Sequence, residues 1–91
     1  MTESEKKFNQ LSKEAFNKIK SNYKSKFKFG NPLTDMIHNN KIHGEMLTET
    51  ADKIAKVSNS IYDESEKEIA LKLAQDKVRE FMPEMKKLRG L

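Results

Sequence analysis

An apolar side chain recurs every three or four positions from Leu33 to Ile61, and no proline interrupts this run. Such spacing gathers apolar side chains on one face of an α-helix. Asn31 and Pro32 stand directly before the run, as an N-cap residue and a first helical residue do. The pattern predicts a helix of about 30 residues, or about 45 Å, in which Gly44 marks a candidate bend. The rest of this short chain must fold along that helix.

Two further helical patterns flank the long one. Thr2 and Glu5 fit a capping box, and apolar residues then continue at helical spacing, which predicts a first helix from about 3 to 22. Asp63 and Ser65 each precede a glutamate by three positions, which predicts a tight turn near 62–65 and a third helix after it. Pro83 is expected to kink this third helix because it cannot donate to the carbonyl four residues earlier.

The segment between the first two helices, Tyr23 to Gly30, alternates aromatic and lysine side chains. This alternation is the period of an extended segment, but no other part of the chain shows a strand pattern with which it could pair. We expect an extended linker or a frayed helix end.

These elements predict an all-α protein with a single helical domain over residues 1–91. A basic N-terminal helix and linker occupy 1–28, and a hairpin of two long antiparallel helices occupies 31–91, with the N-terminal helix laid across it. A chain without cysteine has no disulfides with which to supplement its small core. We therefore expect copies of the chain to cover the apolar outer sides of the hairpin as a homo-oligomer.

The charge is unevenly distributed. The 91 residues include 18 Lys or Arg and 14 Asp or Glu, but residues 1–28 alone hold eight lysines against three glutamates. A basic segment attracts polyanions at low salt. No stretch approaches the roughly 18 consecutive apolar residues of a membrane span, and the first residues lack an apolar signal-peptide core. We expect a soluble, intracellular protein that does not bind membranes.

Residue patterns typical of enzymes are missing. His38 and His43 lie five positions apart, without the spacing or the glutamate of a helical zinc motif, and are interpreted as partly exposed helix residues or as contacts to a phosphate or base. There is no glycine-rich phosphate loop, and most carboxylates occupy capping or solvated positions. We expect no catalytic residues, no metal and no cofactor.

The basic run around 20–29 is the most distinctive chemical feature. Its lysines, Lys20, Lys24 and Lys28, fall on one helical row, and flat rings accompany them. Lysines that neutralise phosphates beside rings that stack on bases can hold a single-stranded or small nucleotide ligand. Alternatively, the rings belong to the core or to an interface and the lysines keep the segment soluble. The rings are those of Tyr23, Phe27 and Phe29. Only two arginines occur in the chain, which disfavours specific readout of duplex DNA.

Several short motifs carry a family resemblance. They are Phe29-Gly-Asn-Pro32, the turn Tyr62-Asp-Glu-Ser-Glu-Lys-Glu-Ile-Ala-Leu71 and Phe81-Met82. Together with the long helix they cover about two thirds of the chain, which resembles the hairpin domain of the phage anti-CBASS protein 2 family. The resemblance implies a homohexamer in the cytoplasm of an infected bacterium. It further implies that the protein binds cyclic di- or trinucleotide second messengers without cleaving them, so that antiphage immunity is not activated.

The resemblance also implies the site residues. Family pockets lie between subunits, with an aromatic ring ahead of the long helix that stacks on a base, here Phe29 or Phe27. Lys41 would pair with a phosphate, and Asn40 and His43 would assist from the adjacent helix turn. A second pocket, for cyclic trinucleotides, would use the cations near the start of the last helix, Lys67 and Lys72.

Two other functions compete with this one. A basic helical hairpin with exposed apolar seams could dock on an acidic host protein and inhibit it, and it would then bind no nucleotide. A nonspecific nucleic-acid binder would show steep salt dependence and no preference for cyclic ligands.

Overall fold

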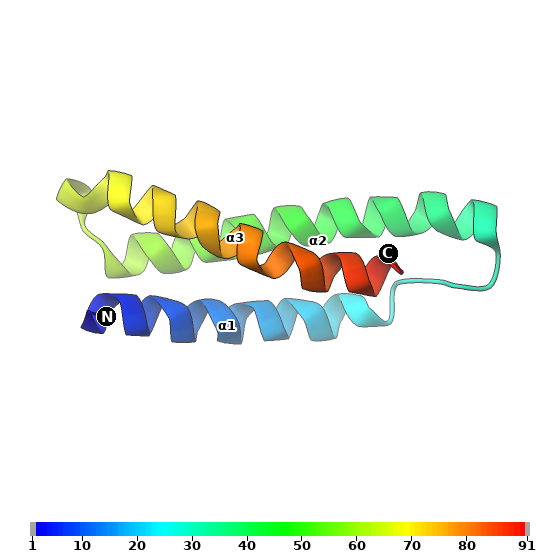
Figure 1. Ribbon diagram of the computed structural model, residues 1–91, viewed down its shortest axis with the longest axis horizontal. Coiled ribbons are helices and arrows are strands. Elements are labelled where there is room, and N and C mark those ends of the chain that lie inside the picture. Colours follow the sequence, from blue (N-terminus) through cyan, green and yellow to red (C-terminus); the bar gives the residue numbers. More distant parts are fainter. Residues whose placement is uncertain (1, 91) are drawn as a thin grey trace.

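The computed structural model describes residues 2–90, and all the regular structure in that range is helical. The elements are α1 (Glu3–Lys24), α2 (Pro32–Ile61), the short 3-10 helix η1 (Glu64–Glu66) and α3 (Lys67–Arg89). The all-α class is confirmed. All three long helices follow the long axis of the molecule, with α2 running opposite to α1 and α3 (Figure 1). The N-terminal helix thus lies lengthwise along the other two. The expectation that it lies across the hairpin is wrong.

Thr2, Asn31 and Asp63 act as caps where the sequence predicts them, whereas Ser65 lies inside η1 and donates to Asp63 Oδ1 without capping α3. Thr2 Oγ1 accepts from the Glu5 amide at 3.1 Å, and Asn31 Oδ1 accepts from the Leu33 amide at 3.1 Å. Asp63 caps η1, and Gly90, with φ of 94°, ends α3 in the left-handed region that favours glycine. α1 extends to Lys24, slightly past the predicted end. Pro83, where a kink is expected, lies inside α3, which continues through it as one helix to Arg89.

α2 packs along both other helices, whereas α1 and α3 meet only sparsely. Its buried side chains from Ile42 to Ser58 recur every fourth residue, which gives a row that is inclined to the helix axis and winds slowly around it. Phe16 of α1 stacks on Phe81 of α3, with ring centroids 4.2 Å apart and an interplanar angle of 5°. The row on α2 consists of Ile42, Met46, Thr50, Ile54 and Ser58.

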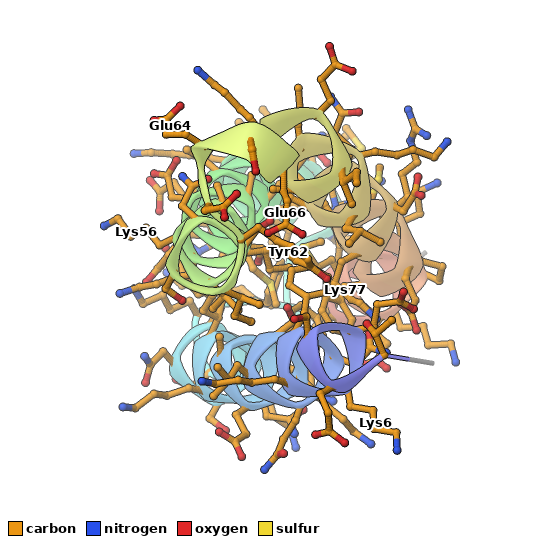
Figure 2. The ribbon with its side chains drawn as sticks, turned by 90° about the vertical axis from the view of Figure 1, so that its left-hand side faces the viewer. Lys6, Lys56, Tyr62, Glu64, Glu66 and Lys77 are labelled. Carbon is orange, nitrogen blue, oxygen red and sulfur yellow. The ribbon has the colours of Figure 1, made fainter. Side chains whose placement is uncertain are left out.

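A lysine fills part of the gap between α1 and α3. Lys77 reaches from α3 toward α1, whereas Lys6 points away from the bundle (Figure 2). The Lys77 side chain is only 14% exposed, and its Nζ lies 2.7 Å from Glu80 Oε2. The same Nζ is 6.0 Å from the ring centroids of both Phe8 and Phe81. Cation–π and ion-pair contacts therefore accompany the aliphatic packing where these two helices stay apart.

The helices differ in length, and this difference shapes one end of the molecule. α3 has 23 residues and α2 has 30. α3 is thus shorter by about 10 Å at 1.5 Å per residue. The first two turns of α2 extend past the C-terminal end of α3 (Figure 1). Three large apolar side chains on these turns remain exposed, namely Leu33, Met36 and Ile37.

Candidate functional site

An open cavity of about 560 Å³ lies where the connection between α1 and α2, the start of α2 and the end of α3 meet. Ligand pockets in proteins commonly measure 300–1,000 Å³. We call it the end cavity. It is lined by Lys28, Phe29, Asn31, Pro32, Asp35, Met36, Asn39, Asn40, Arg89 and Gly90.

Polar side chains from α2 hold the connection in place. The Lys28 amide donates to Asn39 Oδ1 at 2.9 Å, and Asn39 Nδ2 donates to the Lys28 carbonyl at 2.7 Å. Asn39 is buried, so neither bond competes with water. His38, the residue before Asn39, forms a hydrogen bond from its Nε2 to the Lys26 carbonyl at 2.8 Å. The backbone of this connection therefore has partners without belonging to a helix or sheet.

Asp35 holds the last part of the same connection. Its Oδ2 accepts from the amides of Gly30 at 2.7 Å and Asn31 at 2.6 Å. These amides precede the N-terminus of α2, where a negative charge is also favoured by the helix dipole. The carboxylate on the cavity wall is thus already committed to the backbone through one of its oxygens.

Phe29 is the aromatic residue of the connection that faces solvent. Its side chain is 69% exposed on the wall of the end cavity. The ring lies close against Gly90. A Cβ added at Gly90 would be only 3.0 Å from Phe29 Cε1. A glycine is thus required there for its positive φ and for its small size.

The other two rings of the basic run belong to the core. Phe27 and Tyr23 are 7% and 8% exposed. A hydrogen bond to Glu49, followed by burial and the charges of Glu49 and Glu45, raises the pKa of Tyr23 to about 12. Of the two interpretations of the aromatic run, the core interpretation therefore describes Tyr23 and Phe27. Phe27 does not line the end cavity, and only Phe29 presents its ring there.

Two cations line the cavity, Lys28 from the connection and Arg89 from the end of α3. Arg89 Nη1 donates to Asn40 Oδ1 at 3.3 Å, which links the end of α3 to α2. His43 lies one turn further along α2 and is half-buried. Burial lowers the pKa of His43 below its usual value, and the positive charges of Arg89 and Lys86 lower it further. The neutral imidazole is favoured beside these cations.

The structure separates the residues singled out in the sequence. Phe29 and Asn40 line the end cavity together, whereas Lys41 is exposed on α2 outside its lining. Lys67 lines a different surface pocket with Tyr62 and Asp63. Lys72 is exposed on α3 and lines neither pocket.

Sequence reasoning missed most of the cavity lining. The sequence marks Asn31 only as a helix cap, and it places Arg89 near the C-terminus of the third helix, where the helix dipole favours a cation. Arg89 and Asn40 lie 49 positions apart in the sequence, and they meet because α2 and α3 run in opposite directions. Counting residues outward from the turn near 62–65 would have placed the end of α3 beside the early turns of α2.

No protein-family model, curated protein or solved structure matches this chain. Within residues 2–90, no three histidine, aspartate or glutamate side chains converge as metal ligands. In the same part of the chain, every helix falls short of the length and hydropathy that crossing a bilayer requires.

Proposed function

We propose that this protein binds cyclic di- or trinucleotide second messengers in the end cavity and sequesters them without cleaving them. The observation that carries the proposal is Phe29, a large ring that is 69% exposed on a connection fixed by side-chain hydrogen bonds. Exposing an aromatic ring forgoes the stabilisation of burial. A rigid ring beside a cavity offers a stacking surface for a base at little cost in conformational entropy.

The charges of the cavity suit the same ligand class. A cyclic dinucleotide carries two phosphate charges and two base faces. Lys28 and Arg89 supply two positive charges beside Phe29, while Asp35 is engaged with backbone amides. Noncovalent capture needs no group that breaks a bond, and the resemblance to phage anti-CBASS proteins supports this function. The protein would then act in the cytoplasm of an infected bacterium and block immunity that a cyclic nucleotide activates.

Self-association belongs to the same proposal. Leu33, Met36 and Ile37 form an exposed apolar face, and Met36 also lines the end cavity. A second copy seated on this face would remove its apolar side chains from water and would narrow the open side of the cavity. The hexamer implied by the family resemblance is one such assembly.

The test is isothermal titration against a panel of cyclic di- and trinucleotides, followed by analysis of the recovered ligand. We expect submicromolar, saturable binding, with the ligand recovered intact. Phe29→Ala should weaken binding by about tenfold or more, since stacking on an aromatic side chain contributes about 1–3 kcal/mol per base.

Ile69→Ala is the matched control, because Ile69 is an exposed apolar residue of α3 that is not part of the cavity lining. This variant should bind as the wild type does. If no cyclic nucleotide binds at either of two salt concentrations, the proposal is wrong.

One observation favours a second function. The exposed apolar face on α2 could equally seat an acidic host protein, with the lysines of α1 providing complementary charge. This interaction module would show no heat with nucleotides and would retain a specific partner in a pull-down that Ile37→Glu abolishes.

A further inference from the structure

We infer that the end cavity discriminates between bases and prefers guanine to adenine. This inference rests on the proposed nucleotide binding and concerns the chemistry of the polar groups around Phe29. Stacking on Phe29 tolerates every base, since each base has a π-face. Any preference must therefore come from the hydrogen-bonding groups that remain available on the cavity wall.

Adenine is read most directly by an asparagine or glutamine, whose amide pairs with N6 and N7. Such a pair needs both the oxygen and the nitrogen of one amide. Three asparagines line the cavity, and the amide oxygen of each already accepts a hydrogen bond, which a bond from adenine would have to share or displace. Asn39 uses both amide atoms on Lys28. Asn31 Oδ1 accepts from the first amides of α2, and Asn40 Oδ1 accepts from Arg89.

Guanine presents two acceptors, O6 and N7, on the edge that an arginine pairs with. Arg89 lines the cavity, and its Nη1 donates to Asn40 Oδ1 at this wall. A guanidinium has five N–H donors. The Nε donor of Arg89 is buried without a partner, so the donors left for a base edge are those of Nη2 and the second N–H of Nη1. A lysine such as Lys28 acts as a point charge and is better suited to phosphate.

Asp35 does not reverse this preference. Its Oδ2 already accepts from two amides, which leaves Oδ1 to accept from a ligand. The exocyclic amino groups of guanine and adenine can each donate one such bond. The wall therefore offers adenine no asparagine amide that is free of other bonds, whereas the guanidinium of Arg89 matches the acceptor edge of guanine.

Titration of the wild-type protein with cyclic di-GMP and cyclic di-AMP at the same salt concentration tests the inference. The two ligands share ring size and charge and differ in the base. We expect cyclic di-GMP to bind about tenfold more tightly or better, the scale of one bidentate pair. Equal affinities would overturn the base preference and leave the sequestration proposal standing. Binding of neither ligand would overturn the base preference, and it would overturn sequestration as well if no other cyclic di- or trinucleotide of the panel binds.

Arg89→Lys identifies the residue responsible. Lysine keeps the positive charge, loses the planar pair of donors and releases Asn40 Oδ1 to read adenine. We expect this variant to bind cyclic di-GMP about tenfold more weakly and cyclic di-AMP unchanged or more tightly. Equal weakening of both ligands would show that Arg89 contacts only phosphate, and would overturn its assignment as the base reader.

Arg79→Lys is the matched control. Arg79 is the other arginine of the chain, lies on the exposed side of α3 and faces Asp76 at 3.7 Å, away from the cavity lining. This variant should keep both affinities. Thermal melts of the two arginine variants will show whether each is folded under the conditions of the titration.

Discussion

Polar side chains, more than apolar ones, decide the shape of the candidate site. Asn39 bonds to the backbone of the connection between α1 and α2 at its middle, and Asp35 bonds to it at the end beside α2. Each bond replaces one that the unfolded backbone makes to water, so its net contribution to stability is about 1 kcal/mol. Their larger effect is to leave the connection few alternative conformations. Phe29 is consequently held in place while its ring stays exposed.

His43 gives the protein a pH dependence that can be measured. Burial, and then the charges of Arg89 and Lys86, lower its pKa in the folded state below the unfolded value of 6.5. The unfolded chain therefore binds a proton more readily than the folded chain does. Stability from this group is complete above the unfolded pKa and is lost as pH falls through the folded pKa.

We accordingly expect the Tm of the wild type to decrease as the pH is lowered from about 7.5 to about 5, and the Tm of His43→Gln to decrease less over the same range. Differential scanning fluorimetry across that range measures both. His38→Gln is the control, since glutamine can still donate to the Lys26 carbonyl, and it should keep the wild-type pH profile. Identical profiles for wild type and His43→Gln would contradict the prediction.

At the scale of helices, local signals were easier to interpret than contacts distant in sequence. The Asn31–Pro32 start of α2 and the capping box at Asp63 follow from a few adjacent residues, and both are confirmed. The alternating run of rings and lysines was harder, because Phe27 and Phe29 differ in burial although they are two residues apart. Regular extended backbone would place both rings on the same side, so their different burial shows that the connection does not continue as a regular strand. The partnership of Arg89 with Asn40 depends on helix pairing and could not be found locally.

Replacing two of the glycines by alanine should change the stability of the protein in opposite directions. A Cβ at Gly44, inside α2, would have no atom within 4 Å apart from its chain neighbours and the surrounding backbone of the helix. Gly44→Ala should therefore raise the free energy of unfolding by about 1 kcal/mol, because alanine loses less backbone entropy in a helix. Gly90 has φ of 94°, and a Cβ there would lie 3.0 Å from Phe29 Cε1. Gly90→Ala should lower stability and displace the ring.

Urea unfolding of both variants measures these changes, with Gly44→Ala as the control for the general effect of removing a glycine. Destabilisation by Gly44→Ala would mean that something outside this chain, such as a second copy, approaches α2 at that point. The same variant would then also show weaker self-association by light scattering.

The whole molecule is long and thin for its size. Its extents are 49 × 19 × 17 Å, and its radius of gyration is 14.9 Å. A compact chain of this length would have a radius of gyration of about 12 Å. An elongated bundle has more surface for the same core, and the sparse packing between α1 and α3 adds to that surface. Both features favour further burial by association, and the exposed side chains of Leu33, Met36 and Ile37 indicate where it would occur.

Light scattering can test that association directly. The chain has a mass of 10.6 kDa, so an assembly will appear as a multiple of this value, six-fold for the hexamer. We expect Ile37→Glu to dissociate it, because a charge placed in an apolar interface must be desolvated without a partner. Ile69→Glu, which changes an exposed apolar residue near the other end of the bundle, should leave the mass unchanged. A wild-type mass of one chain at every concentration would contradict self-association. Loss of assembly in both variants would move the interface away from the end cavity.

Titrating Ile37→Glu with cyclic di-GMP then separates the two roles of this end. Unchanged affinity would mean that one chain holds the ligand alone, whereas lost affinity would mean that the second copy completes the cavity.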